Sequence, residues 1–172
     1  MPVHVALLRA VNVGGRKLPM ADLRDVLTDL GATSVRTYVQ SGNAVFESSA
    51  AAAGRLAEAL TGHCGFEVRV LLRSAADLRR VGAKQPLDGP ESAWHVTFLD
   101  AKPDAAAVRA LDPSAYGGDT FRVVGREVYL RTPGGYGRTK LTNALFEKKL
   151  GVAATTRNWR TVTTLAEMAA GG

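Results

Sequence analysis

The sequence has few of the residues that build disulfides and metal sites. Its 172 residues include a single cysteine, Cys64, so no internal disulfide can form. The three histidines, His4, His63 and His95, are scattered along the chain and do not have the spacing of a zinc site with Cys64. We therefore expect neither a metal site nor a bound cofactor.

Long apolar runs are also missing. No stretch approaches the roughly 18 apolar residues of a membrane-spanning helix. The first residues, 1–5, have neither the basic start nor the apolar middle of a signal peptide. We therefore expect a cytoplasmic protein with no membrane contact. A hydrophobic content of 46% with 22% charged residues is typical of globular proteins, and the length suits one domain or two small ones.

The net charge of +6 is concentrated in two places. The window 138–160 has six basic residues and one acid, Glu147, and therefore holds most of the excess. The first 21 residues contain Arg9, Arg16 and Lys17 and no acid. Local clusters of this kind attract anions. The alternative is an ordinary solvated surface.

Apolar periodicity and turn residues predict the same order of elements in both halves of the chain. The first half has predicted strands at 3–8, 35–39, 44–47 and 68–72 and helices at 19–30 and 50–62, with Gly42-Asn43 as a two-residue hairpin turn. A capping box of Ser74 and Asp77 then opens a short helix. The second half has predicted strands at 94–98, 120–124, 127–131 and 153–157 and helices at 103–111 and 140–150, followed by a closing helix.

This order is β-α-β-β-α-β, repeated, which is the ferredoxin-like split βαβ motif. The sequence therefore predicts an α+β protein of two tandem ferredoxin-like modules with antiparallel sheets and extra helices. We place the modules at 1–84 and 93–172, with the proline- and glycine-containing segment 85–92 as a linker. Gly14-Gly15 and Leu30-Gly31 recur 120 residues later, in line with duplicated βαβ units.

Four stretches resemble the bacterial proteins grouped as domain of unknown function 1697. They are Leu7–Gly15, Arg36–Asn43, Lys140–Asn143 with Phe146–Lys149, and Ala154–Trp159, in the order that the family has them. Ala10 stands where the family usually has glycine. The resemblance implies a tandem ferredoxin-like architecture and, because the family is uncharacterised, no activity. It also implies that any function would use these four stretches.

Two glycine-rich loops connect a strand to a helix, at Gly14-Gly15 and at 134–140. Exposed N–H groups in such loops, followed by a helix N-terminus, can hold a phosphate or a carboxylate. Neither loop has the Walker or dinucleotide pattern, which disfavours ATP hydrolysis. The alternative is that the glycines only supply unusual backbone angles. Likewise, Trp159 is either core or a base-stacking platform beside Arg157.

Candidate ligand-binding residues are polar, basic or aromatic side chains of the four stretches, together with two glycines. They are Arg9, Asn12, Gly14, Gly15, Lys17, Gln40, Ser41, Asn43, Lys140, Asn143, Arg157, Asn158 and Trp159. Amides and bases dominate this set and a catalytic acid or base is missing, so it indicates recognition and leaves catalysis open.

We therefore expect a protein that binds an anionic, phosphate-bearing ligand or a nucleic acid at its glycine-rich loops and basic surface. One alternative is an enzyme that acts on a small anionic metabolite in a cleft between the modules. The other is an assembly module with no small-molecule site. The sequence does not predict an oligomeric state.

Overall fold

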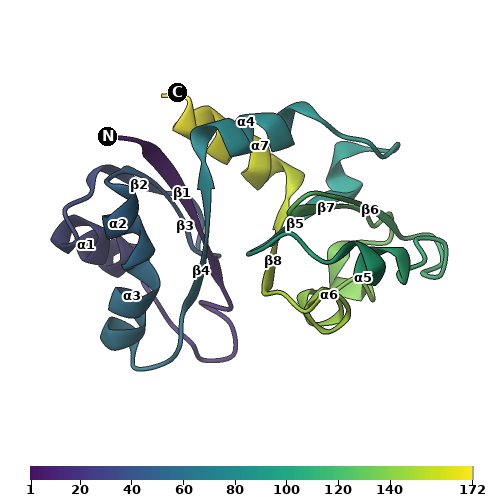
Figure 1. Cartoon of the computed structure of the whole chain (residues 1–172), viewed down its shortest axis with the longest axis horizontal. Helices are drawn as coiled ribbons and strands as arrows, with labels where there is room; N and C mark the ends of the chain where they lie inside the picture. Colours follow the sequence, from purple (N-terminus) through teal and green to yellow (C-terminus); the bar gives the residue numbers. More distant parts are fainter. Residues whose placement is uncertain (172) are drawn as a thin grey trace. The chain divides into compact units, whose positions relative to one another are not determined.

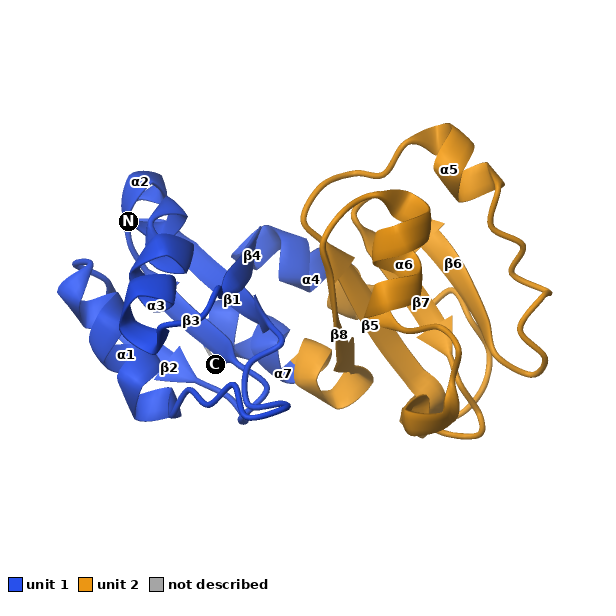
Figure 2. Cartoon of the chain, turned by 90° about the horizontal axis from the view of Figure 1, so that it is seen from below, with its two compact units in different colours: residues 1–80, 164–172 blue, residues 81–163 orange. Residues whose placement is uncertain are grey.

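The computed structural model describes residues 1–171 and contains two four-stranded antiparallel sheets with helices (Figure 1). The predicted α+β class and the doubled β-α-β-β-α-β order are therefore confirmed. The chain forms two compact units, Met1–Arg80 with Thr164–Gly172 and Val81–Thr163 (Figure 2).

The sheet of the first unit has the strand order β2-β3-β1-β4. Its strands are β1 (Val3–Arg9), β2 (Thr33–Thr37), β3 (Asn43–Glu47) and β4 (Arg69–Ser74), and its helices are α1 (Met20–Asp29), α2 (Ala50–Gly54) and α3 (Leu56–Cys64). The single helix predicted at 50–62 is thus two helices. Arg55 ends α2 and begins α3, directly after Gly54, a poor helix former.

Helices α1, α2 and α3 cover one face of this sheet (Figure 1). Alternate residues of the central strands, such as Ala6, Leu8 and Phe46, pack with helix residues such as Leu23 and Leu60 in one buried cluster. Side chains alternate between the faces of a strand, so Val5 and Leu7 project from the other face of β1, and they are fully buried as well. Burial on both sides is what the continuous apolar run of β1 predicts.

The sheet of the second unit has the strand order β6-β7-β5-β8, the same arrangement as the first. Its strands are β5 (Trp94–Leu99), β6 (Thr120–Val124), β7 (Glu127–Arg131) and β8 (Ala154–Asn158), and its helices are α5 (Ala105–Arg109) and α6 (Asn143–Leu150); the short 3-10 turns are η1 (Glu91–Ala93) and η2 (Tyr136–Arg138). Helix α6 begins three residues later than predicted, because the Thr142 hydroxyl caps it by accepting a hydrogen bond from the Leu145 N–H.

The extra helices are α4 (Ala75–Ala83), which follows β4, and α7 (Trp159–Ala169), which follows β8. The predicted capping box before α4 is confirmed, since the Ser74 and Asp77 side chains each accept the other's backbone N–H at 2.9 and 3.0 Å. The last turns of α7 group with the first unit. The module boundaries at 1–84, 85–92 and 93–172 stay a prediction. Within residues 1–171, no helix is long and apolar enough to cross a membrane.

Candidate functional site

The first two family-like stretches meet in the first unit, at a place that we name the loop junction. It consists of residues 10–17, which connect β1 to α1, and residues 38–43, which connect β2 to β3. The Asn12 side chain joins them: its amide donates to the Gln40 carbonyl at 2.6 Å and to the Leu18 carbonyl at 3.0 Å. Its oxygen accepts the Leu18 N–H at 2.9 Å. Asn12 therefore connects the two loops, and both the nitrogen and the oxygen of its side-chain amide are hydrogen-bonded within the protein.

Backbone strain is concentrated at the loop junction. Four non-glycine residues in the described chain have positive φ, and three of them lie here: Ala10 at 58°, Asn12 at 57° and Val39 at 50°. Asparagine tolerates this conformation, whereas alanine and the β-branched valine do so at a steric cost of about 1–2 kcal/mol each. Strained residues of this kind cluster at ligand sites and switch regions.

The turn at 38–43 differs from the predicted hairpin. Strand β2 ends at Thr37 and β3 begins at Asn43, so Gly42-Asn43 is not a two-residue loop. Gly42 has a φ of 90° and packs so tightly that an added Cβ would lie 2.8 Å from the Leu8 Cβ. Asn43 is fully buried and donates to the Tyr38 carbonyl at 2.8 Å and the Ser41 hydroxyl at 3.0 Å. Asn43 therefore stabilises the turn 38–43 from its buried side.

Arg16 has a structural role at the loop junction that its place in a basic cluster of the sequence does not predict. Its Nε donates to the Ala10 carbonyl at 3.0 Å, and its guanidinium donates to the Glu67 carbonyl. The guanidinium carbon lies 4.7 Å from the centre of the Phe66 ring, a cation–π contact. Arg16 thus ties the loop to the segment before β4.

An open pocket of about 450 Å³ lies at the loop junction, lined by Asn12, Gly15, Lys17, Pro19 and Gln40. Lys17 is exposed, and within residues 1–171 its ammonium has no hydrogen-bond or ion-pair partner. Pro19 precedes α1 and supplies no side-chain cap. The pocket therefore places an exposed cation beside the N-terminus of α1.

The remaining candidates of the first unit lie in less accessible or separate places. Arg9 is half-buried at the end of β1, opposite Arg69 of β4, and does not line the pocket. Ser41 is exposed on the turn and accepts the hydrogen bond from Asn43. Of the predicted residues in this unit, the structure therefore brings Asn12, Gly15, Lys17 and Gln40 together.

In the second unit, a chain of hydrogen bonds links the last two family-like stretches. The Thr156 hydroxyl of β8 donates to the Asn143 side-chain oxygen at 2.6 Å, and the Thr97 hydroxyl of β5 lies 2.6 Å from that of Thr156. This network fixes the orientation of the Asn143 amide at the start of α6. Lys140 is exposed just before the helix.

Arg157 and Trp159 are buried, with 6% and 7% of their surfaces exposed. Arg157 donates to the Thr155 hydroxyl at 2.7 Å and the Thr156 carbonyl at 3.0 Å, and burial lowers the pKa of its guanidinium to about 10. Trp159 packs edge-to-face on Trp94, with ring centres 5.7 Å apart. These positions support the interpretation of Trp159 as core. Neither residue presents a stacking platform to solvent.

The exposed Asn158 is the last residue of β8 and directly precedes α7, and its side-chain oxygen accepts the Thr161 N–H at 2.8 Å. Asn158 is therefore the N-cap of that helix. Its carbonyl-type oxygen is occupied by this bond, as expected for an N-cap residue.

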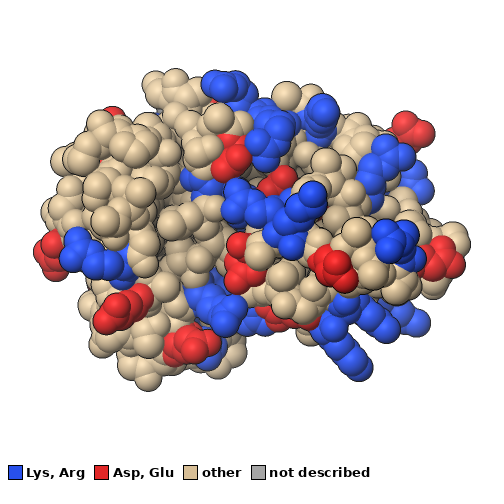
Figure 3. Space-filling view, viewed as in Figure 1, with Lys and Arg blue, Asp and Glu red and all other residues tan. Residues whose placement is uncertain are grey.

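The exposed basic residues of the window 138–160 lie before α6, in its last turn and after β8. Asn143 at the start of α6 contacts Thr156 near the end of β8, while Glu147 accepts the Ala154 N–H at the beginning of that strand. Helix and strand therefore run in opposite directions. Lys140 precedes α6, whereas Lys148 and Lys149 end it, about 12 Å away for a helix of eight residues. On the face drawn in Figure 3, acidic side chains are interspersed among basic ones.

Sequence reasoning missed a pair of rings in the second unit. The His95 ring of β5 stacks on Tyr136 of the second glycine-rich loop, with centres 4.8 Å apart. The His95 Nδ1 is buried and has no hydrogen-bond partner within residues 1–171, and burial lowers the pKa of the imidazole. The alternation of side chains along β5 predicts on which side of the sheet His95 lies. It does not predict that the loop 134–140 folds so that Tyr136 contacts the His95 ring.

Comparison with known proteins agrees with the architecture. The structure of the conserved bacterial protein SP0830 from Streptococcus pneumoniae is similar, with a TM-score of 0.77, 23% identity and 99% of each chain covered, which shows a shared fold. No curated protein matches the chain. Residues 1–129 match the family described as "Protein of unknown function (DUF1697)"; this range contains the loop junction but ends before the stretches at 140–149 and 154–159. Because the match spans 129 of 172 residues, the chain belongs to the DUF1697 family.

Proposed function

We propose that the protein binds an anionic, phosphate-bearing ligand at the pocket of the loop junction. The observation that carries this proposal is Lys17: an exposed ammonium with no partner within residues 1–171, in the wall of a pocket. A lone surface lysine would be unremarkable. This one lies beside the uncapped start of α1, where the helix dipole also favours an anion.

Backbone donors add to this positive field. The N–H groups of Gly14 and Gly15 have no hydrogen-bond acceptor within residues 1–171. The one acid in the first turn of α1, Asp22, is engaged by His63, whose Nε2 lies 3.0 Å from its carboxylate. These unpartnered N–H groups and the Lys17 ammonium are all donors, which favours a ligand rich in acceptors, such as a phosphate.

The rigidity of the walls supports a defined site. The side chains of Asn12 and Arg16 make three and two hydrogen bonds, respectively. These bonds tie the loop 10–17 to Gln40, to Leu18 and to Glu67 before β4. Donors held in position by the fold need not be ordered when the ligand arrives, which lowers the entropy cost of binding. The groups left for the ligand are the Lys17 ammonium, the Gln40 side chain and the glycine N–H groups.

A small ligand is favoured over a nucleic acid. Nucleic-acid binding depends on several cations along one surface, and the basic window of the second unit is divided between the two ends of α6. The enzyme alternative lacks comparable support, because the Lys140 ammonium pairs with no carboxylate within residues 1–171.

The test is a titration of the protein with inorganic phosphate and with a short single-stranded oligonucleotide, followed by amide NMR. We expect phosphate to shift the signals of residues 12–17 and 40. The Lys17→Gln variant should bind about tenfold more weakly or worse, because a charge-assisted hydrogen bond contributes about 1.5–3 kcal/mol. Lys102→Gln, which removes an exposed lysine of the second unit, is the matched control and should bind as the wild type does.

Equal phosphate affinity in the wild type and Lys17→Gln would contradict the proposal. The oligonucleotide distinguishes a small phosphate-bearing ligand from a nucleic acid. Binding of the oligonucleotide that is tighter than that of phosphate, falls steeply with salt and is lost in Lys17→Gln would make a nucleic acid the ligand of this same pocket.

A further inference from the structure

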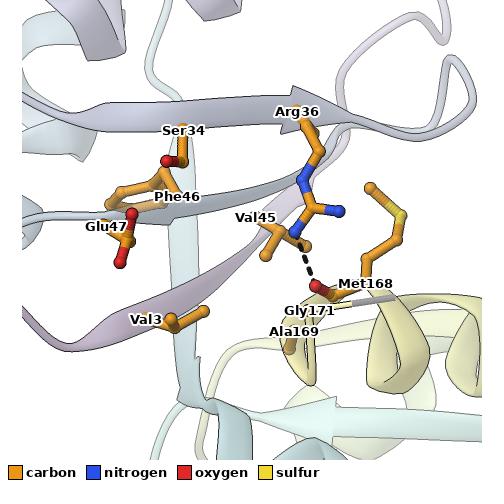
Figure 4. A pocket seen from close by; sticks show the side chains of 9 residues that line it. All are labelled: Val3, Ser34, Arg36, Val45, Phe46, Glu47, Met168, Ala169 and Gly171. Carbon is orange, nitrogen blue, oxygen red and sulfur yellow. Dashed lines mark hydrogen bonds between the residues drawn. The ribbon is translucent and has the colours of Figure 1, made fainter.

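A second pocket lies on the face of the first sheet that α1 and α3 do not cover. Val3 pairs with Glu47, and Arg36 pairs with Val45. Since side chains alternate along a strand, Val45 and Glu47 project from the face opposite to Phe46, which belongs to the helix-covered core. The pocket has a volume of about 360 Å³ (Figure 4).

The last turn of α7, with Met168 and Ala169, forms one wall of this pocket together with Gly171, which follows the helix. Arg36 reaches across and donates a guanidinium N–H to the Met168 carbonyl at 2.5 Å. A cation at a helix C-terminus is favourable because the last carbonyl groups have no partner inside the helix. Arg36 thereby holds its charge at one end of the pocket.

Glu47 lies at the other end, with Val45 between the two charged side chains (Figure 4). The Glu47 side chain is half-buried, and within residues 1–171 its carboxylate has no hydrogen bond and no ion pair. A carboxylate that is partly removed from water without a partner is destabilising. A cation supplied from outside would remove that cost.

Strand β2 is irregular where it borders the pocket. The register between β2 and β3 shifts between Thr33 and Arg36, and Ser34 has a φ of 52°. Bulges re-aim side chains and are over-represented beside binding sites. The Ser34 side chain, which lines the pocket, supplies a hydroxyl between the two charged ends.

We propose that this pocket binds a small zwitterion with an apolar middle, of the size of a dipeptide. Its ammonium group pairs with Glu47, its carboxylate with Arg36, and its body lies against Val3 and Met168, which line the pocket and are partly exposed. Arg36 of β2 is opposite Val45 of β3, so Arg36 and Glu47 are diagonal cross-strand neighbours, and their side chains leave the sheet about 7–8 Å apart. That spacing is too long for the adjacent charges of a single α-amino acid and suits the termini of a dipeptide. This site is separate from the loop junction and does not depend on the function proposed there.

The test uses the dipeptide Ala-Ala, titrated into the full chain and followed by amide NMR at residues 34–36, 45–47 and 168–171. N-acetyl-Ala-Ala, which lacks the ammonium group, and Ala-Ala amide, which lacks the carboxylate, are compared with it. We expect each to bind at least about tenfold more weakly than Ala-Ala.

Glu47→Gln keeps the shape of the side chain and breaks no contact within residues 1–171, so the variant should fold normally. It should lose at least about tenfold in affinity for Ala-Ala while its affinity for N-acetyl-Ala-Ala stays unchanged. Glu58→Gln, which alters an exposed glutamate on α3, is the matched control and should bind as the wild type does. No shift at these residues with about 10 mM Ala-Ala, or equal affinity in Glu47→Gln and the wild type, would overturn the proposal.

Discussion

The side-chain amide of Asn12 donates a hydrogen bond of 2.6 Å to the backbone carbonyl of Gln40. The two residues are 28 positions apart and belong to different family-like stretches. Their hydrogen bond joins the two loops of the loop junction. These loops contain Ala10 and Val39, which have positive φ, and the exposed Lys17, which lines the pocket.

Removal of the Asn12 side chain should destabilise the first unit. Asn12→Ala loses three hydrogen bonds and places an alanine at a φ of 57°. We expect the free energy of unfolding to fall by about 2–4 kcal/mol, at about 1 kcal/mol for each bond and about 1 kcal/mol for the backbone. Urea denaturation measures the change. Glycine adopts a positive φ without strain, so Asn12→Gly should lower the free energy of unfolding by about 1 kcal/mol less than Asn12→Ala does. A decrease of less than about 0.5 kcal/mol in both variants would show that the Asn12 side chain does not hold the two loops together.

Replacement of Ala10 by glycine should stabilise the protein. The φ of 58° at Ala10 costs an L-residue about 1–2 kcal/mol, more than the entropy that glycine adds to the unfolded chain. We expect Ala10→Gly to raise the free energy of unfolding by about 0.5–1 kcal/mol in the same assay. Ala144→Gly, in the exposed face of α6, should do the opposite by about 1 kcal/mol. A loss of stability in both variants would contradict the assigned strain.

Gly42 and Gly15 should respond very differently to alanine. Both have positive φ, but a Cβ at Gly42 would lie 2.7 Å from the Val11 Cγ2, whereas nothing lies within 4 Å of a Cβ at Gly15. Gly15→Ala should therefore cost about 1–2 kcal/mol, for the backbone alone. Gly42→Ala adds overpacking of about 1–3 kcal/mol. Thermal melting of the two variants side by side tests this order, and equal losses would show that the turn relaxes freely.

Stability should fall in mild acid because of His95. Burial lowers the pKa of this imidazole from the unfolded value of 6.5, so the unfolded chain takes up a proton at a pH where the folded chain does not. Uptake by the unfolded state means that the stabilising contribution is complete above about pH 6.5 and is lost as the pH falls below it. The urea midpoint of the wild type should therefore drop between about pH 7.5 and about pH 5.

His95→Phe keeps a ring against Tyr136 and cannot be protonated, so part of this drop should disappear in the variant. His63→Gln serves as the control, because His63 is exposed beside Asp22. An identical pH profile in the wild type and His95→Phe would assign the acid sensitivity to the carboxylates instead.

Most elements could be predicted from local patterns, and the errors have local causes as well. The strands at 120–124 and 127–131 were predicted at their observed bounds, since apolar alternation and Gly125 define both. The helix at 50–62 was predicted as one piece because its apolar spacing continues across Arg55. The turn at Gly42 was assigned as a tight hairpin because sequence does not show that this glycine packs against Leu8 and Val11.

The candidate site was predicted less completely. Lys17, Gln40 and Gly15 do line one pocket, but Asn43 and Arg157 are turned into the protein. Their polarity suggested a ligand, whereas the fold supplies their partners: Tyr38 and Ser41 for the amide, Thr155 and Thr156 for the guanidinium. The pocket at Arg36 and Glu47 could not be predicted from the sequence, because its wall includes Met168, which is far from both residues along the chain.

The amino-acid sequence by itself determined the element order, the α+β class and the family, because periodicity, turn residues and short motifs are local properties. It also located the strand-to-helix loop that contains Lys17. Only the tertiary structure decided which polar groups remain available to bind a ligand. Hydrogen bonds such as that from Asn12 to Gln40 join residues distant in the chain, and whether a side chain is satisfied by the protein or left for a ligand depends on those partners.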